Sequence, residues 1–430
     1  MELLRSLKQA RIVVDGRAAL SCSGVHPGWI QLEPVADGKA ASFPLHIDVE
    51  ITRRCNLLCR HCLSAANRHG LPSELSTREI LEVVDEADRY GAFLLKFCGA
   101  EPFLRKDLPD LLDAACQGRC VLSLLTNCTL ITKADAVRLG RITALREQSF
   151  GLGTSLDGAR PETHDWFRGR KGAFAQALRG MRLLSEQGVR LTIQTSLNQR
   201  NLEEMGAIAK IAASLNTELL VYLLPVRLGR GRKMGGSFLS SDQMLRAMRV
   251  AAEIANRYSG RFRVNFDPRH TPVQSKDEPA ASPVPAGHTG KKHRRARALD
   301  VLSVAPPPCT CPAGVYMVAV AADGSAFPCG DCVGCHELSG GSVKNAPLHR
   351  IWRTDAWARL RGGWSWQDLA VCKTCADFGG CGPKICRGYP ATALGDFYGP
   401  MPECLDADGQ LTAVRRAVNT QDAAEEHPVA

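Results

Sequence analysis

The stretch "TRRCNLLCRHC" at residues 52–62 places Cys55, Cys59 and Cys62 within eight positions. Thiolates are the ligands of iron–sulfur clusters, and a 4Fe–4S cluster takes one ligand on each of its four irons. Three cysteines on one loop would leave one iron open to another molecule. A structural zinc site needs four protein ligands, and His61, which lies between Cys59 and Cys62, cannot easily turn to the same metal. The spacing therefore favours a catalytic cluster over structural zinc.

The whole chain has the composition of an ordinary folded protein. Its 430 residues include 45% apolar and 23% charged residues and suffice for about two or three domains. No apolar run approaches the roughly 20 residues that cross a bilayer, and the N-terminal segment lacks the apolar core of a signal peptide. We therefore expect a cytoplasmic protein with no membrane partner. In a reducing compartment, the clustered members of its 18 cysteines indicate metal or redox chemistry rather than disulfides.

About half of the net charge of +10 comes from one run, "KKHRRAR" at 291–297. The run lies in a Pro/Ala/Ser-rich stretch without amphipathic periodicity, which predicts a flexible linker over 263–307. A solvated linker segment is favoured over a nucleic-acid contact. We therefore expect no nucleic-acid partner.

Strand and helix patterns alternate before this linker. The predicted strands are 46–52, 92–97, 120–126, 149–156, 190–197 and 218–224, and the predicted helices include 107–115, 174–188, 202–214 and one that opens at the capping box Ser76–Glu79. Six strand–helix units predict a parallel sheet wrapped by helices, and they are too few for a closed eight-stranded barrel. We therefore expect an α/β fold with a partial (β/α)6 barrel. All unusual motifs of this half follow strands, at the ends where such folds carry their active sites.

Cys55-x3-Cys59-x2-Cys62 resembles the signature of the radical S-adenosylmethionine (SAM) enzymes, with His61 at the position usually held by an aromatic residue. The segment "CGAEP" (98–102) is similar to the family's "GGEP", whose backbone carbonyls receive the SAM amino group, although Cys98 and Ala100 depart from that pattern. The stretch "SLDG…FRG" resembles the segment in which a Ser and an Arg hold the SAM carboxylate. The resemblance implies a catalytic role for the three cysteines and cofactor contacts from His61, Cys98, Gly99, Ala100, Glu101, Ser155 and Arg168.

The family's chemistry follows as an implication of this resemblance. SAM would chelate the open iron, and the reduced cluster would pass one electron into the sulfonium group. The resulting 5′-deoxyadenosyl radical would take a hydrogen atom from the substrate. The electron would come from a donor such as flavodoxin or ferredoxin.

Seven further cysteines after the linker are similar in order to the SPASM extension, which holds two auxiliary 4Fe–4S clusters in a subset of these enzymes. By this resemblance the second auxiliary cluster is held by Cys372, Cys375, Cys381 and Cys404, and the first by Cys311, Cys329 and Cys386. The four residues between Cys381 and Cys386 depart from the usual three. The fourth ligand of the first cluster stays open among Cys309, Cys332 and Cys335, and a site with three protein ligands is an alternative.

The expected organisation is a strand-rich extension over 1–45, the partial barrel over 46–262, the linker over 263–307, a cysteine-rich SPASM-like domain over 308–405 and a polar tail over 406–430. The linker would let the second domain sit over the barrel mouth. SPASM relatives act mostly on peptides, so we expect a peptide or protein substrate that is cross-linked, epimerised or oxidised during ribosomal peptide maturation. A small metabolite such as a sugar, aminoglycoside or tetrapyrrole is the alternative, followed by a non-enzymatic iron–sulfur or zinc protein. A peptide could pair with an exposed strand edge, and the basic residues Arg227, Arg230, Arg232 and Lys233 would attract an acidic leader.

Overall fold

The computed structural model describes residues 40–266, 311–362, 364, 366–369, 371–374 and 386–405. The predictions for the N-terminal extension before residue 40, for most of the linker and for the tail lie outside these residues, as do those for Cys309, Cys375 and Cys381.

A ten-stranded sheet forms the centre of the described part of the chain, in the order β10-β9-β8-β1-β2-β3-β4-β5-β6-β7. The strands are β1 His46–Glu50, β2 Leu94–Cys98, β3 Val121–Leu125, β4 Phe150–Ser155, β5 Leu191–Ser196, β6 Thr217–Leu223, β7 Arg263–Phe266, β8 Met317–Val320, β9 Ser325–Phe327 and β10 Gly341–Ser342. The helices are α2 Thr77–Arg89, α3 Leu108–Gln117, α4 Lys133–Arg146, α5 Pro161–Arg168, α6 Ala173–Glu186, α7 Met205–Ala213, α8 Ser241–Arg257, α9 Leu348–Trp352 and α10 Gly388–Leu394.

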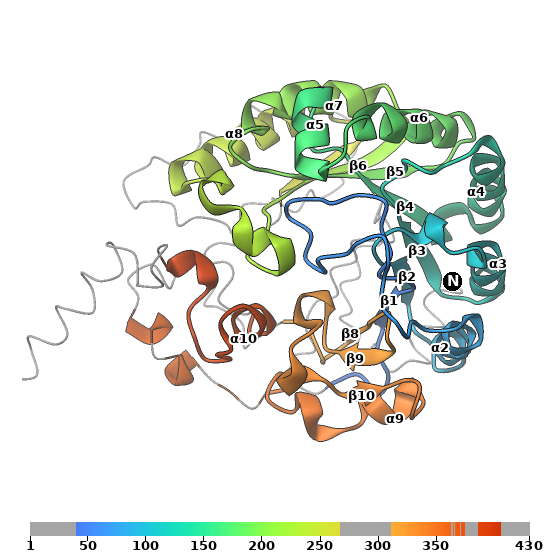
Figure 1. Ribbon diagram of the computed structural model, residues 1–430, viewed down its shortest axis with the longest axis vertical. Helices are drawn as coiled ribbons and strands as arrows, with labels where there is room; N and C mark the ends of the chain where they lie inside the picture. Colours follow the sequence, from blue (N-terminus) through green and yellow to red (C-terminus); the bar gives the residue numbers. More distant parts are fainter. Residues whose placement is uncertain are drawn as a thin grey trace, which may run out of the picture.

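The six predicted strands are confirmed as β1 to β6, and each pairs in parallel with the next. Parallel neighbours need a crossover connection, and helices supply it here. Figure 1 shows these helices around the outside of the curved sheet. The predicted partial barrel is therefore confirmed.

Local sequence signals explain where α2 begins and which face it buries. Ser76 accepts a hydrogen bond from the backbone N–H of Glu79, and the Glu79 carboxylate accepts one from Ser76 in return. This reciprocal pair satisfies two N–H groups that would lack partners at the helix start. Ile80, Val83 and Ala87 then recur at helical spacing and are buried against the sheet.

One strand was missed at the far edge of the sheet. The predicted linker begins at residue 263, but Arg263–Phe266 forms β7, which pairs in parallel with β6. Its four residues alternate between exposed and half-buried positions. So short and polar a run carries little strand signal, and its pairing with β6 decides its conformation.

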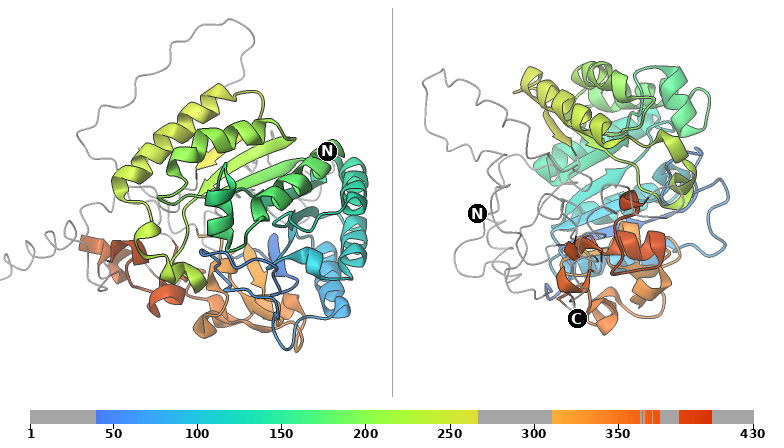
Figure 2. Two further views of the ribbon diagram at one scale, coloured as in Figure 1. Left: turned by 45° about the horizontal axis from the view of Figure 1, so that its top comes forward. Right: turned by 90° about the vertical axis from the view of Figure 1, so that its left-hand side faces the viewer.

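The segment after the linker joins the barrel sheet instead of standing apart from it. β8 pairs in parallel with β1, in register from His46 opposite Met317 to Val49 opposite Val320. β9 and β10 continue the sheet in antiparallel order. Both views in Figure 2 place these orange elements beside the blue end of the sheet. β8 therefore covers the edge of β1, and the outer strands of the described sheet are β10 and β7.

Hydrophobic packing and polar contacts both join the two regions. One continuous core runs from Phe43 through the barrel strands to Trp352 and Phe397. The carboxylate of Glu86 on α2 accepts hydrogen bonds from the backbone N–H groups of Leu348 and His349 at 2.8 and 2.9 Å, which satisfies two free donors at the start of α9. The C-terminal region is thus fixed relative to the barrel mouth.

Candidate active site

The cysteine loop after β1 is held against the last turn of α5. The backbone N–H of Leu58 donates to the carbonyl of Arg168 at 3.1 Å, and that of Arg60 donates to the carbonyl of Phe167 at 2.9 Å. Gly169 ends α5 with a φ of +66°, and a Cβ there would overlap the carbonyl oxygen of Leu58. Only glycine combines this backbone conformation with so close an approach.

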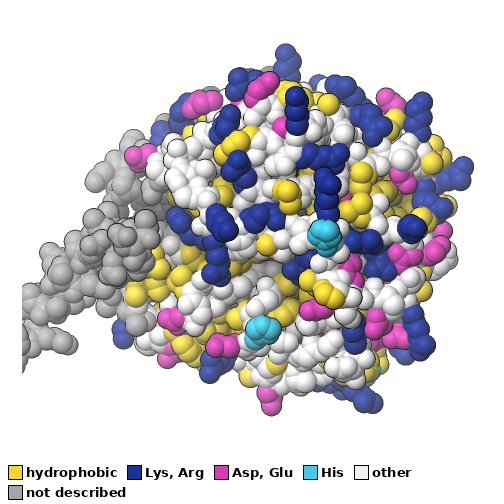
Figure 3. Space-filling model, in the orientation of Figure 1, with side chains coloured by type: hydrophobic (Ala, Val, Ile, Leu, Met, Phe, Trp, Pro, Cys, Tyr) yellow, Lys and Arg dark blue, Asp and Glu magenta, His cyan; other side chains and the backbone are white. Residues whose placement is uncertain are grey.

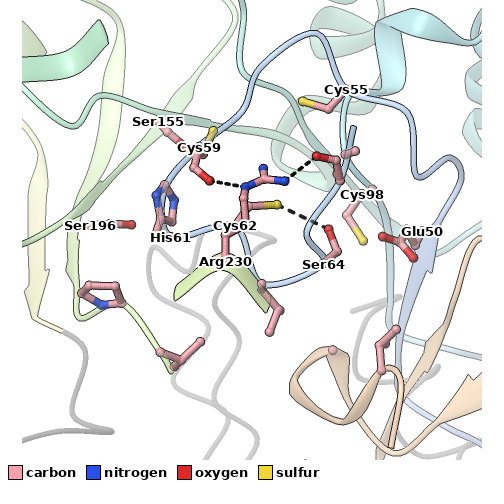
Figure 4. A pocket seen from close by; sticks show the side chains of 18 of the residues that line it. Glu50, Cys55, Cys59, His61, Cys62, Ser64, Cys98, Ser155, Ser196 and Arg230 are labelled. Atoms are coloured by element: carbon pink, nitrogen blue, oxygen red, sulfur yellow. Dashed lines mark hydrogen bonds between the residues drawn. The ribbon is translucent and has the colours of Figure 1, made fainter. Parts of the chain in front are cut away.

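Arg230 holds the same loop from the opposite side. Its Nε donates to the carbonyl of Cys59 and its Nη1 to the carbonyl of Ala66, both at 2.7 Å. Figure 4 shows the guanidinium beside the loop that carries the three thiols. These loop carbonyls occupy the hydrogen-bond donors of Arg230, so its local role is to hold the cysteine loop, and its attraction for an acidic leader stays a prediction.

A pocket of about 400 Å³ opens beside this loop at the carboxyl ends of the barrel strands. Residues from widely separated parts of the chain line it. They include the predicted site residues Cys55, Cys59, His61, Cys62, Cys98, Gly99, Ala100, Ser155 and Arg168. The structure thus brings together every residue of the predicted SAM site except Glu101, which lies beneath the pocket wall.

The segment "CGAEP" departs from the family pattern at Cys98 and Ala100 but keeps Gly99, the position where the backbone requires glycine. Its φ is +137°, and a Cβ at this position would come within 2.5 Å of the carbonyl oxygen of Thr52. That carbonyl accepts a hydrogen bond from the backbone N–H of Ala100 at 2.9 Å. The one glycine that the backbone requires is present, and the side chains of its two neighbours line the pocket.

Glu101 is completely buried and fixes the loops after β2 and β3 to each other. Its carboxylate accepts hydrogen bonds from the Thr126 hydroxyl at 2.7 Å and from the Asn127 N–H at 2.8 Å. Burial raises the pKa of Glu101 to about 7, although these hydrogen bonds lower it. Its structural role is therefore to position the "CGAEP" segment from below.

Arg168 is the only cationic side chain of the pocket lining that carries a buried carboxylate partner. Its Nη2 lies 2.5 Å from Oδ2 of Asp157, and its Nη1 lies 3.6 Å from the sulfur of Cys59. Its Nε is buried without a hydrogen-bond partner in the part of the chain that the structure describes. A buried guanidinium N–H without an acceptor is costly, so an anionic ligand atom that reached Nε would satisfy it. This agrees with the expected contact to the SAM carboxylate.

His61 takes the place of an aromatic residue by stacking. Its ring lies parallel to that of Phe167, with ring centroids 4.3 Å apart. Burial lowers the pKa of His61 well below its usual value, and the positive charges of Arg168 and Arg230 lower it further. His61 is therefore neutral near pH 7 and supports the cysteine loop by packing.

The opposite wall of the pocket is acidic, which the sequence analysis missed. Asp48 on β1 lies 2.7 Å from both Lys96 and His46, and Glu50 lies 2.5 Å from Arg53. Burial raises the pKa of Asp48, but Lys96 and His46 outweigh it and hold that pKa below its usual range. The available signal was the spacing, because polar residues two apart on a buried strand share its inner face.

The thiols fit an iron–sulfur cluster better than a single metal ion. Among the described residues, no group of three His, Cys, Asp or Glu side chains is arranged to hold one ion. A 4Fe–4S cluster does not require such convergence, because each cysteine binds a different iron. The three loop cysteines line one pocket without a fourth protein thiol from that loop, which is the donor set of a cluster with one open iron.

Comparisons with known proteins give two domain matches and a set of relatives. Residues 49–212 match the radical SAM superfamily, and residues 309–377 match SPASM, an iron–sulfur cluster-binding domain. The chain is 28% identical to an AdoMet-dependent heme synthase of Oleidesulfovibrio alaskensis, over 89% of this chain and 92% of that protein. It is 26% identical to the mycofactocin maturase MftC of Mycobacterium tuberculosis, over 86% and 85%. The fold resembles SuiB of Streptococcus suis bound to its precursor peptide SuiA, with a TM-score of 0.64 and 15% identity over 86% of this chain and 77% of SuiB.

These matches agree with the site as the structure presents it. Within the described residues, no helix has the length and hydrophobicity to cross a membrane. The two matched domains imply 4Fe–4S clusters and SAM as the cofactors. The chain is therefore a radical SAM protein whose barrel is followed by a SPASM iron–sulfur cluster-binding domain.

Proposed function

We propose that this protein is an enzyme that cleaves SAM reductively and abstracts a hydrogen atom from a peptide or protein substrate. Cys55, Cys59 and Cys62 hold the 4Fe–4S cluster in this proposal, and Ser155 and Arg168 hold the SAM carboxylate. The observation that carries it is the single pocket in which these five side chains meet. When bound, the reduced cluster and SAM supply a 5′-deoxyadenosyl radical.

The chain itself positions the cofactor. Asp157 fixes the guanidinium of Arg168, whose buried Nε has no acceptor in the described part of the chain. A planar guanidinium can give two parallel hydrogen bonds to a carboxylate. Gly99 lets the backbone of "CGAEP" run close to the cysteine loop, where its carbonyls can accept from the SAM amino group. An external donor such as flavodoxin or ferredoxin supplies the electron.

The pocket's charge favours a peptide over a polyanion. Asp48 is paired with Lys96 and His46, and Glu50 with Arg53. Arg168 and Arg230 are held by Asp157 and by loop carbonyls, so the protein itself balances most charges of the lining. Asn127, Gln194 and Ser196 add uncharged polar groups that can bind amides. A peptide backbone meets such a lining without the penalty of leaving several carboxylates unpaired.

The outer surface near the mouth is basic. Figure 3 shows Lys and Arg side chains gathered along the upper edge of a hydrophobic band on this face. Arg232 and Lys233, which follow β6, are exposed. Arg232 also donates to the carbonyl of Thr392 at 3.0 Å, so part of its charge links the barrel to α10. We retain these two residues among the candidates for attracting an acidic leader segment.

A tetrapyrrole is the second candidate substrate. Three heme synthases match this chain at 27–28% identity over 85–89% of its length. A 206-residue segment is also 36% identical to an Fe-coproporphyrin III synthase of Methanosarcina barkeri, covering 47% of this chain and 49% of that protein. This similarity favours a tetrapyrrole substrate. Its propionate carboxylates would have to bind beside the acidic side chains of the pocket.

One parallel assay tests the proposal and separates the two substrates. Anaerobically reconstituted protein is incubated with SAM and dithionite, together with either a precursor peptide encoded beside the gene or iron-coproporphyrin III. We expect 5′-deoxyadenosine to form and the peptide to lose two hydrogens, or to take up solvent deuterium if it is epimerised, as measured by mass spectrometry. Decarboxylation of the porphyrin with an unchanged peptide would assign the tetrapyrrole instead. If no 5′-deoxyadenosine forms under any condition, the enzyme proposal is wrong.

A further inference from the structure

A second group of thiols lies directly behind one wall of the pocket. Gly330, Asp331 and Val333 line the pocket, and Cys329 and Cys332 belong to the same turn. The sulfurs of these two cysteines are 3.5 Å apart. Cys332 is completely buried. The turn therefore presents backbone and Asp331 to the substrate space and two thiols to the opposite side.

Two more thiols reach this place from distant segments. Cys311, which precedes β8, lies within hydrogen-bonding range of the Cys386 side chain. Cys329 and Cys386 each lie near enough to both Cys311 and Cys332 to interact with them, and the Cys329 and Cys332 sulfurs are in contact. Four thiols from three segments thus form one group.

The backbone at the start of α10 packs closely against two of the four thiols. A Cβ on Gly388 would overlap the sulfur of Cys332 and would lie 3.9 Å from that of Cys329. Glycine therefore lets the helix backbone approach both sulfurs, as backbone often does around a bound group. Cys386 lies two residues before Gly388, so the same segment supplies a thiol and the space beside it.

We propose that Cys332 is the fourth protein ligand of the first auxiliary cluster, together with Cys311, Cys329 and Cys386. This assignment rests on the proposed function. Cys335, the other candidate in this segment, makes no side-chain hydrogen bond within the described residues, and only its backbone N–H contacts Cys332. The described contacts thus join Cys332, and not Cys335, to the other thiols.

A four-thiolate site has a consequence for the reaction. All four irons of a 4Fe–4S cluster are then ligated by protein, so the substrate cannot bind an open iron there. The cysteine loop after β1 offers only three thiols and keeps the open position. Substrate is therefore held by the pocket side chains, with the auxiliary cluster behind the turn at Gly330–Cys332.

Single-cysteine variants of the full chain test the assignment. Cys332→Ala is compared with the matched changes Cys335→Ala and Cys309→Ala after anaerobic reconstitution. Iron and sulfide are counted per chain, and EPR spectra are recorded on reduced and mildly oxidised protein. We expect Cys332→Ala either to lose about four irons or to give a 3Fe–4S signal on oxidation, because the unligated iron is the one released. We expect the other two variants to match the wild type.

Further outcomes keep the assignment separate from the proposed function. Cys332→Ser retains a weaker oxygen ligand, and we expect it to keep the iron while shifting the EPR signal of one cluster. Wild-type spectra and iron content in both Cys332 variants would overturn the assignment, as would the predicted losses appearing in Cys309→Ala instead. Formation of 5′-deoxyadenosine without substrate is measured in every sample. The assignment can then fail while SAM cleavage persists, whereas a wild-type protein without iron or SAM cleavage would refute the proposed function first.

Discussion

Replacing Gly169 by alanine should displace the cysteine loop, and Gly172→Ala provides a matched control. Both glycines have a left-handed backbone, with φ of +66° and +82°. They differ in their surroundings, because a Cβ on Gly169 would overlap the carbonyl oxygen of Leu58, whereas a Cβ on Gly172 would meet nothing within 4 Å. The comparison therefore isolates the contact between α5 and the cysteine loop.

The expected losses in the free energy of unfolding follow from the left-handed backbone conformation and from the steric overlap with Leu58. Placing a non-glycine residue in the left-handed region costs about 1–2 kcal/mol, which both variants bear. Forcing an extra methyl into a packed site costs a further 1–3 kcal/mol or so, which only Gly169→Ala bears. The loop can relieve this second cost by moving away from α5. We therefore expect Gly169→Ala to lose about 2–5 kcal/mol in the free energy of unfolding and Gly172→Ala about 1–2 kcal/mol.

Denaturant unfolding of the metal-free protein and iron counting after reconstitution measure the two effects. Displacement of Leu58 also moves Cys59, so Gly169→Ala should retain about four fewer irons per chain, the content of one cluster. Gly172→Ala should keep the wild-type iron content. Equal destabilisation of the two variants, with full iron in both, would refute the reasoning that the α5 contact positions the cysteine loop.

Three further predictions concern the cofactor site. Arg168→Lys should weaken SAM binding by about tenfold or more in calorimetry, because lysine cannot give two parallel hydrogen bonds to a carboxylate. Arg170→Lys is the control, and equal SAM affinities of the two variants would contradict the assigned contact. The pKa of Glu101 is raised by burial from 4.5 to about 7, so its stabilising protonation is complete below pH 4.5 and is lost as the pH rises toward 7. This difference corresponds to about 3 kcal/mol, and Glu101→Gln should remove that part of the pH dependence of unfolding; an unchanged profile would show that Glu101 does not titrate there. Replacing all three loop cysteines by alanine should abolish 5′-deoxyadenosine formation and remove about four irons per chain. Cys128→Ala, at a buried thiol outside the pocket, should keep the activity and the iron. SAM cleavage by the triple variant would contradict the radical mechanism.

The fusion of the C-terminal region with the barrel sheet bears on how the pocket is built. Because β8 pairs with β1, the turn at Gly330–Cys332 is fixed beside the strand that carries Asp48 and Glu50. Both regions therefore contribute to one wall of the substrate space. A substrate bound there would contact the barrel and the cluster-binding region together.

The barrel and most members of its site could be predicted from local patterns in the amino-acid sequence. Alternating apolar strands and amphipathic helices are local patterns, and the capping box at Ser76 marks a helix start within four residues. The six parallel strands follow, since their carboxyl ends must share one face. Cys55 and Gly99 could thus be assigned to one mouth from their positions after strands, whereas Arg168, at the end of a helix, was assigned through the family resemblance.

The contacts between distant segments could not be predicted in this way, because they depend on packing across the whole fold. Arg230 follows β6 as an apparent surface charge, and its role appears only when its side chain reaches the carbonyls of Cys59 and Ala66. The pairing of β8 with β1 joins segments that lie on opposite sides of the linker. No local pattern encodes this partner, because the hydrogen-bonding groups of a strand edge can pair with any extended segment. The choice of Cys332 over Cys335 is also tertiary, since the two lie three residues apart and only the packing of α10 shows which sulfur joins Cys329.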